Sequence, residues 1–270
     1  MAPRPITLLS DYGTDDEFAG VCRAVIARIA PDARVIDLTH GIPRHAVRQG
    51  AAVLANALPF TPPGIHFAVV DPGVGGGRRG VAVRTANEDR VLVGPDNGLL
   101  LAAAERAGGV VEAVDLSDSP FCLEPVSATF QGRDVFAPVA ARLALGADLD
   151  EAGEPIDSTS LVVMAPTVPQ LSPERILAHV TSVDRFGNAS LDLTRRHLSE
   201  MPLKMGEAIG VEAGQERFEA IVDVTFEGVE PGRMLLYEDS YGSLALAVNR
   251  GSAAELLGLS PGAEVVLRPG

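Results

Sequence analysis

A glycine-rich stretch with two arginines, VVDPGVGGGRRG, spans residues 69–80 and opens with an apolar run that ends in the carboxylate of Asp71. Such a stretch can cradle a phosphate, make a plain turn, or build a small charged site from Asp71 and an arginine. A Walker-type phosphate loop needs a lysine and a Ser or Thr after its glycines, and a dinucleotide loop needs a helix next. Here the chain has no lysine at that point and returns to strand character with GVAVRT, residues 80–85. We therefore expect the glycines to turn the backbone sharply and bring an arginine back towards Asp71.

Polar side chains end three of the apolar runs that we expect to be strands. Asp11 follows ITLLS, Asp71 follows FAVV, and Asp96 with Asn97 follows VLVGP. Ligands of open parallel sheets bind beyond the carboxyl ends of the strands. Each position alone is explained equally well as a helix N-cap, because Asp is a preferred capping residue. Three such positions at one edge of a sheet favour a ligand site.

The segment SDYGTDDEFAG, residues 10–20, places Asp11, Asp15, Asp16 and Glu17 at the start of the first expected helix. Acids in a first helical turn complement the helix dipole, which is the structural alternative. The functional interpretation is that one acid binds the hydroxyls of a ligand and another binds its ammonium group. Because a carboxylate can accept two hydrogen bonds from a vicinal diol, Asp11 at the strand end is the better candidate for a ribose. The cluster lacks the spacing of a metal-binding loop, so we expect no metal there.

A second group of candidates lies in ATFQGRDVFAP, residues 128–138. Gly132 permits a tight turn into a helix that begins at Arg133, and Thr129 and Gln131 would then face a cleft. An ordinary junction between a strand and a helix explains the same residues.

Two further turns, VDRFGN at 183–188 and EDSYGSLALAVNRGSA at 238–253, carry polar and aromatic side chains. In the first, Asn188 could pair with the edge of a purine while Phe186 covers its face. The second offers Ser240, Tyr241 and Asn249. Hairpin turns of ordinary composition are the structural alternative for both.

The elements that must position these residues change in kind along the chain. In the first half, short β-rich runs alternate with helical patterns, which predicts an α/β domain with a mostly parallel sheet and helices on both faces. The expected strands are 5–11, 33–39, 65–71, 80–85, 89–95 and 110–116. The expected helices are 16–30, 44–58, 97–108 and 133–146. We place this domain at residues 1–150, with the catalytic candidates.

Residues 151–173 are rich in proline and acid and are predicted to be a linker. Beyond them the runs are strand-like and separated by glycine turns, so residues 174–270 are predicted to form a smaller all-β domain, a barrel that completes the substrate site. Only residues 194–201 and 251–258 have a helical pattern there.

Composition excludes several classes of partner. The 270 residues carry a formal net charge of −14, which argues against binding to nucleic acid or to an anionic membrane surface. The sequence shows no apolar run of membrane-spanning length and no signal peptide. Cys22 and Cys122 are far apart without metal-type spacing, so we expect two buried thiols in a cytoplasmic protein rather than a disulfide.

The motifs taken together resemble those of the S-adenosyl-L-methionine hydroxide adenosyltransferases, which are related to fluorinases and chlorinases. The resemblance covers essentially the whole chain, and its segments are SDYGTDDEFAG, VVDPGVGGGRRG, GPDNGLL, TFQGRDVFAP, VDRFGN and SYGSLALAVNRGSA. It implies an N-terminal α/β domain, a C-terminal β-barrel, and a homotrimer whose sites lie between neighbouring subunits. It also implies displacement at the ribose 5′ carbon by water or hydroxide, releasing adenosine and L-methionine without a cofactor or a metal.

The resemblance also assigns roles to residues. The catalytic aspartate and arginine of the family fall on Asp71 and Arg78, and its catalytic histidine falls on Gln131, where this sequence departs from the family. Tyr241 stands where the halogenases have a ligand-binding arginine. The substrate contacts expected from the motifs and the resemblance together are Asp11 for the ribose hydroxyls, Asp16 for the methionine amine, Thr129 and Phe130 for the ribose pocket, Asp184 and Ser240 for methionine, Phe186 and Asn188 for adenine, and Tyr241 and Asn249 nearby.

Three alternatives to a hydrolase of this family stay open at this point. A protein without the family histidine could bind S-adenosylmethionine or adenosine without turning it over, although Asp71 and Arg78 would not be needed for binding alone. A halogenase would need a non-anionic pocket for its halide, and the family's halogenases lack an acid at the position of Asp71. An unrelated acid-cluster hydrolase would need a metal ion.

Overall fold

The computed structural model describes residues 2–198 and 205–269. The chain divides into two compact units, Met1–Met164 and Ala165–Gly270, and each is described by itself. This division falls inside the predicted linker, residues 151–173.

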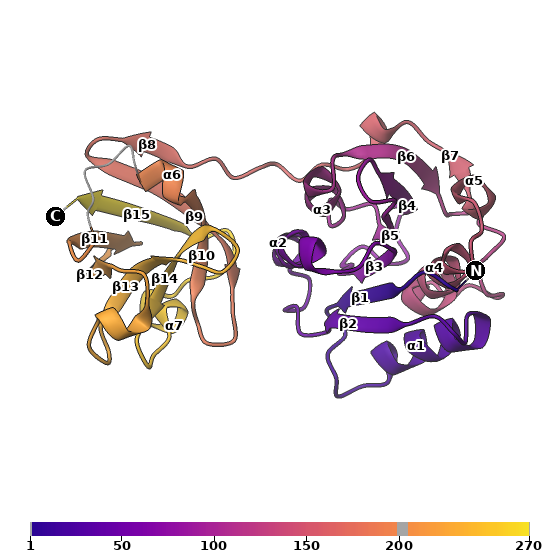
Figure 1. The fold of residues 1–270 in the computed structure, drawn as a ribbon, viewed down its shortest axis with the longest axis horizontal. Helices are drawn as coiled ribbons and strands as arrows, with labels where there is room; N and C mark the ends of the chain where they lie inside the picture. Colours follow the sequence, from indigo (N-terminus) through magenta and orange to yellow (C-terminus); the bar gives the residue numbers. More distant parts are fainter. Residues whose placement is uncertain (1, 199–204, 270) are drawn as a thin grey trace. The chain divides into compact units, whose positions relative to one another are not determined.

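The first unit is built on a seven-stranded sheet of order β2-β1-β3-β5-β4-β6-β7 (Figure 1). Its strands are β1 (Ile6–Ser10), β2 (Val35–Thr39), β3 (Ile65–Val69), β4 (Gly80–Thr85), β5 (Val91–Pro95), β6 (Val110–Asp115) and β7 (Glu154–Pro155). Strands β2, β1, β3 and β5 pair in parallel, and β6 shares their direction because it is antiparallel to β4, which is itself antiparallel to β5. The six strands predicted for this half and the mostly parallel sheet are confirmed.

Helices cover both faces of this sheet, because its central strands are apolar on both sides (Figure 1). The helices α1 (Phe18–Ile29) and α4 (Ala137–Ala144) pack over one core, which includes Leu8 and Phe67. The helices α2 (Val47–Ala57) and α3 (Leu101–Arg106) pack over the other. All four predicted helices are present, although a π-helical turn at Gly132–Phe136 forms the beginning of the last.

Part of the range predicted as a linker is folded against the first unit. The helix α5 (Leu149–Ala152) precedes β7, which pairs with β6. A short 3₁₀ turn at Ser158–Ser160 follows, and Leu161 is buried in the core under α2 and α3.

The second unit is a closed barrel. Its strands are β8 (Gln170–Ser172), β9 (Arg175–Val183), β10 (Ala189–Thr194), β11 (Ala208–Ala213), β12 (Glu216–Val222), β13 (Met234–Glu238), β14 (Ser243–Val248) and β15 (Glu264–Pro269). The order β10-β14-β13-β12-β11-β15-β9-β8 closes because β9 also pairs with β10, which leaves β8 appended outside the ring. The buried positions of β9 alternate with partly exposed ones, as a strand with one buried face requires. The predicted barrel is confirmed.

Two short helices lie in the barrel unit. The helix α7 (Ala253–Leu257) is capped by the Ser252 hydroxyl, which accepts from the Glu255 N–H at 3.0 Å, and ends at the left-handed Gly258. The helix α6 (Arg195–Leu198) accounts for the start of the helix predicted at 194–201, and residues 199–201 lie outside the described residues.

The two cysteines are free thiols in different settings. Cys22 is on the buried face of α1, and burial raises its pKa to about 12. The expectation of a second buried thiol was wrong: Cys122 is only half-buried, because it lies in an irregular segment after β6. Among the helices of the described residues, none is long and apolar enough to cross a membrane.

Candidate active site

The glycine loop begins and ends at the same edge of the sheet. Strands β1 and β3 are parallel neighbours, with Ser10 opposite Val69, so Asp11 and Asp71 lie one and two residues beyond the same edge of the sheet. Strand β4 runs in the opposite direction, and its first residue, Gly80, lies level with Pro95 at the end of β5. A loop that leaves β3 and enters β4 therefore returns to where it started, as the sequence predicted.

Arg78 returns to Asp71 and forms a bidentate pair with it. The Arg78 Nε donates to Asp71 Oδ1 at 3.0 Å, and its Nη2 donates to Oδ2. The two side chains are only 12% and 5% exposed, so water screens this pair poorly. At Gly75, with φ of +76°, a Cβ would stand 2.5 Å from the Ala128 carbonyl oxygen, so only glycine permits this close approach.

Gln131 completes the set that was predicted to be catalytic. The Arg78 Nη2 donates to Gln131 Oε1 at 2.6 Å, which joins the glycine loop to the start of the π-helical turn. The guanidinium also lies 5.5 Å from the centre of the Phe136 ring. The carboxylate, guanidinium and amide thus form one hydrogen-bonded chain with defined orientations.

An aromatic cluster that the sequence reading missed adjoins this chain. The rings of Tyr12, Phe18 and Phe130 pack with centroids 5.0 to 5.9 Å apart. The Tyr12 hydroxyl lies so close to Gly132 that a Cβ there would be 2.0 Å from it. Burial raises the pKa of Tyr12 well above its ordinary value, and nearby Cys22 and carboxylates add to this, so the phenol stays neutral. The sequence signal for this cluster was the position of Tyr12 directly after the candidate Asp11.

The remaining candidates of the first unit are arranged around this edge. Asp11 is half-buried, and its Oδ2 accepts from the His45 N–H at 3.1 Å. Asp16 and Thr129 are exposed. Helix α1 begins at Phe18 with Glu17 as its N-cap residue, so Asp11, Asp15 and Asp16 lie before the helix and not in its first turn.

Asp96 and Asn97, which follow the third predicted strand end, make hydrogen bonds within the first unit. The Asp96 carboxylate, 5% exposed, accepts from Arg79 at 2.7 and 3.1 Å and from the Val162 N–H at 2.8 Å. Asn97 donates to the Val70 carbonyl at 2.9 Å and so fixes the end of β3 just before Asp71. Asp96 thus holds Arg79 and the backbone at Val162 in place, which is a role within the fold.

The first barrel turn is organised within itself. Asp184 Oδ1 accepts from the N–H groups of Phe186 and Asn188 at 2.8 and 2.9 Å, and Oδ2 accepts from Asn188 Nδ2 at 2.8 Å. The Phe186 side chain is 71% exposed. The Asn188 Oδ1 is buried and has no hydrogen-bond partner within the described part of the chain.

The second barrel turn is held by a residue that the sequence reading did not single out. Asp239 accepts from the N–H groups of Tyr241 and Ser243 at 2.9 and 3.0 Å and from the Ser190 hydroxyl at 2.9 Å. Ser240 and Tyr241 are exposed at the tip of this turn. Asn249, by contrast, donates to the Val229 carbonyl at 2.7 Å and serves the fold.

Tyr237 lies between the two turns. Burial raises the pKa of Tyr237 to about 12, and the carboxylates of Asp184 and Asp239 add to the shift. Both acids therefore lie near one phenol, which places the candidate turns around a common point of the barrel unit. Across residues 2–198 and 205–269, no three His, Cys, Asp or Glu side chains are grouped to hold a metal ion.

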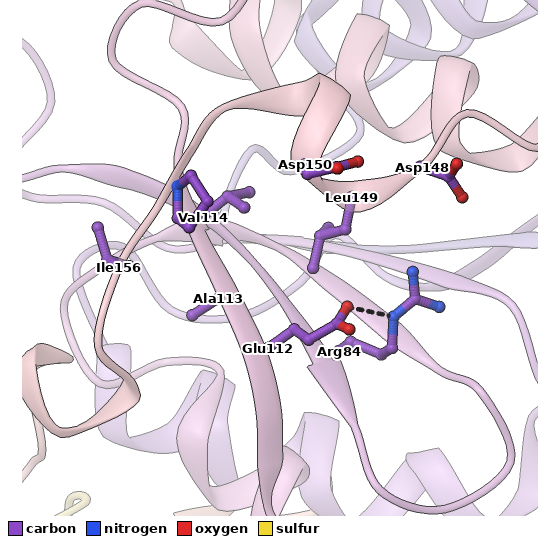
Figure 2. A pocket seen from close by; sticks show the side chains of 9 residues that line it. Arg84, Glu112, Ala113, Val114, Asp148, Leu149, Asp150 and Ile156 are labelled. Atoms are coloured by element: carbon purple, nitrogen blue, oxygen red, sulfur yellow. Dashed lines mark hydrogen bonds and ion pairs between the residues drawn. The ribbon is translucent and has the colours of Figure 1, made fainter.

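A separate cavity of about 460 Å³ lies between β6, β7 and α5 (Figure 2). Acids dominate its polar lining, and its one arginine, Arg84, is paired with Glu112 at 2.8 Å. None of the predicted site residues lines this cavity, so it does not serve the chemistry described above.

Comparison with known proteins agrees with this arrangement. Residues 6–153 match the SAM hydroxide adenosyltransferase N-terminal domain, and residues 178–266 match the C-terminal domain of the same family. Proteins named (R)-S-adenosyl-L-methionine hydrolase are similar: that of Salinispora tropica is 48% identical, covering 97% of both chains, and that of Salinispora arenicola is 45% identical, covering 100% of both.

A more distant relative and a solved structure are also similar to this chain over nearly its whole length. A fluorinase of Nocardia brasiliensis is 27% identical over 99% of this chain and 98% of its own. The crystal structure of an uncharacterized conserved protein from Thermotoga maritima superposes with a TM-score of 0.89 at 35% identity, covering 97% of this chain and 99% of that one. The chain belongs to the SAM hydroxide adenosyltransferase family.

Proposed function

We propose that this protein hydrolyses S-adenosyl-L-methionine to adenosine and L-methionine by attack of water at the ribose 5′ carbon. The observation that carries the proposal is the hydrogen-bonded set of Asp71, Arg78 and Gln131 at the carboxyl edge of the sheet. The names of the similar curated hydrolases specify the (R) configuration at sulfur, so we propose that diastereomer as the preferred substrate.

The reaction forms one O–C5′ bond and breaks the C5′–S bond, whose electron pair passes to sulfur. Because sulfur starts as a cation, methionine leaves with a neutral thioether and needs no general acid. The attacking water loses one proton to solvent. The protein must therefore align a water behind the 5′ carbon and remove it from bulk solvent.

The geometry suits Asp71 to this alignment. Both of its oxygens already accept hydrogen bonds from Arg78, and Oδ1 also accepts from the Gly73 N–H at 3.3 Å. A carboxylate held this firmly is better suited to orient a water than to move with a proton. Gln131 takes part by holding Arg78 from the other side.

Substrate binding is the second part of the proposal. Asp11 would accept from the ribose hydroxyls and Asp16 from the methionine amine, while Thr129 and Phe130 line the ribose. Asp184 and Ser240 would bind the methionine end, with Phe186 and Asn188 at the adenine and Tyr241 and Asn249 nearby. The unpaired Asn188 Oδ1 and the exposed Phe186 ring support the adenine assignment.

Assembly and location complete the proposal. The adenine candidates lie in a different unit from the catalytic set, and we propose that a homotrimer brings units of neighbouring subunits together without a cofactor. Sedimentation at assay concentration tests this, because a fully active monomer would contradict it. A cytoplasmic location agrees with two free thiols.

The test is to incubate the protein with each sulfonium diastereomer in ¹⁸O-labelled water. We expect adenosine and L-methionine in equal amounts, faster from the (R) form, with the label in the adenosine 5′ hydroxyl. Binding without adenosine would favour a protein that has lost turnover with the family histidine. Formation of a 5′-halogenated nucleoside in chloride or fluoride would favour a halogenase, although the Asp71 carboxylate would repel a halide. Loss of activity with a strong chelator would point to a metal-dependent hydrolase.

A further inference from the structure

A chain of a serine, a histidine and an aspartate lies beside Asp11; Ser10 and His40 are buried, and the Asp37 side chain is 34% exposed. The Ser10 Oγ and the His40 Nδ1 are 2.7 Å apart, and the His40 Nε2 lies 3.2 Å from Asp37 Oδ1. Arg23 of helix α1 donates to the other oxygen of Asp37 at 2.5 Å. The chain thus runs from a helix, through the ends of β2 and β1, to the loop that carries Asp11.

This constellation is not a hydrolytic triad. A nucleophilic serine must reach a substrate, but Ser10 is 2% exposed and its oxygen already accepts from the Tyr12 N–H at 3.2 Å. The direction of the chain follows from its other end. Because the Asp37 carboxylate can only accept, His40 Nε2 carries the proton donated to it, which leaves His40 Nδ1 to accept from the Ser10 hydroxyl.

The same histidine also holds the backbone around Asp11. The Gly13 N–H donates to the His40 carbonyl at 2.8 Å, and the Ile42 N–H donates to the Ser10 carbonyl at 3.4 Å. The residues on both sides of Asp11 are therefore fixed by His40 or by the segment after it. The Asp11 carboxylate is oriented by the hydrogen bond that it accepts from the His45 N–H. His45 itself has an unusual positive φ of 67°.

We propose that Ser10, His40 and Asp37 are positioning residues that hold the Asp11 carboxylate in the orientation needed to bind the ribose hydroxyls. This inference rests on the proposed function, because it takes Asp11 as the ribose ligand. The network acts on substrate binding rather than on the nucleophile, since it contacts the backbone of the loop after β1 and not the chain of Asp71, Arg78 and Gln131.

The test compares the affinities of adenosine and 2′,3′-dideoxyadenosine, measured by calorimetry on the full protein. Wild type should prefer adenosine by roughly 10-fold or more, since hydrogen bonds to a charged acceptor are being removed. Asp11→Ala should abolish this preference. Ser10→Ala should reduce it to about 3-fold or less, with kcat for S-adenosylmethionine changed far less than KM. Asp37→Asn should change the preference for adenosine and the KM in the same directions by smaller factors. It serves as the test if Ser10→Ala does not fold.

Thr7→Val is the matched control. Thr7 lies on the same strand, and its hydroxyl makes an equally buried contact with His66 Nδ1 at 2.9 Å, away from the candidate site. It should lower the melting temperature about as much as Ser10→Ala while leaving the preference for adenosine intact. An unchanged preference in Ser10→Ala, or an equal loss in Thr7→Val, would overturn the inference. If wild type formed no adenosine at all, the proposed function would fail instead, whatever the variants did.

Discussion

The two units organise their candidate residues over different distances in the chain. In the first unit Gln131 meets Arg78 across 53 positions, whereas in the barrel Asn188 meets Asp184 across 4. The first arrangement exists only in the folded domain and orients groups that would be costly to bury unpaired. The second is a turn that could form by itself and displays an aromatic ring. This contrast suggests that the first unit fixes the chemistry and the barrel adjusts affinity.

The largest expected effect is on the first unit. Asp71→Asn replaces one carboxylate oxygen, which accepts from Arg78, by an NH2 group that cannot accept. The side chain then no longer orients the attacking water. We expect kcat to fall by roughly 100-fold or more while the affinity for S-adenosylmethionine stays close to that of wild type. Asp15→Asn, at an exposed acid before helix α1, is the control and should leave both unchanged. A kcat within a few-fold of wild type for Asp71→Asn would remove Asp71 from the water-handling role.

Gln131→His should act in the opposite direction. A glutamine amide accepts from Arg78 but never titrates, whereas an imidazole can accept and also carry charge near neutral pH. We expect kcat to rise by roughly 10- to 100-fold, and single-turnover adenosine formation between pH 6 and 9 to acquire a histidine-dependent step. Gln131→Ala, which removes the acceptor altogether, should instead be slower than wild type.

Two results would contradict this account of Gln131. An unchanged rate in Gln131→His would show that the position is outside the catalytic set of this protein. If the main change in Gln131→His were tighter substrate binding, position 131 would face the substrate and not the attacking water.

The barrel turn should show the converse behaviour. Asp184→Ala removes three hydrogen bonds that shape the turn around Phe186 and Asn188. We expect KM to rise by about 5- to 10-fold with kcat within about 2-fold, because only binding groups are displaced. Asp157→Ala is the matched control: it caps a short turn through the Thr159 N–H and hydroxyl, both at 2.8 Å, away from the candidate residues. A drop in kcat without a change in KM would refute the division of roles.

The first unit was largely predictable because its signals were local. The return of an arginine to Asp71 was predictable because the glycine loop leads directly into another strand, and the choice of Arg78 came from the family resemblance. The expectation that Gln131 is catalytic could not be derived from its neighbours in the sequence and came only from the family resemblance. Nothing in the sequence tells which of two adjacent arginines faces which strand-end acid, so the pairing of Arg79 with Asp96 was missed.

Residues that act through others were also missed. Tyr12 and Asp239 lie inside the predicted site segments, next to Asp11 and Ser240, which were the residues predicted to bind the substrate. Asp37 lies in a predicted strand and His40 directly follows it, and only the pairing of β2 with β1 shows that His40 meets Ser10. Tertiary hydrogen bonds of this kind depend on a one-residue register that a pattern of apolar residues does not specify.

The smallest expected effect concerns the acid stability of the two units. Burial disfavours the charged form of Asp134, but its two hydrogen bonds from Arg133 and one from the Ser127 N–H outweigh this and lower its pKa from 3.8. The unfolded chain therefore binds this proton more readily than the folded one. Asp134 contributes stability that is complete above about pH 4 and is lost as the pH falls through its lower folded-state pKa.

Asp134→Asn should accordingly flatten the fall of the melting temperature between pH 6 and 3, besides lowering it at pH 6. The barrel offers a matched comparison in Glu212, whose pKa is lowered chiefly by the hydrogen bond from Arg268 at the surface. Because water and salt screen an exposed pair, Glu212→Gln should change the melting temperature less than Asp134→Asn at every pH. Parallel curves for wild type and Asp134→Asn would show that this ion pair does not distinguish the folded from the unfolded state. A larger effect of Glu212→Gln would mean that the barrel, rather than the π-helical turn beneath Gln131, limits stability in acid.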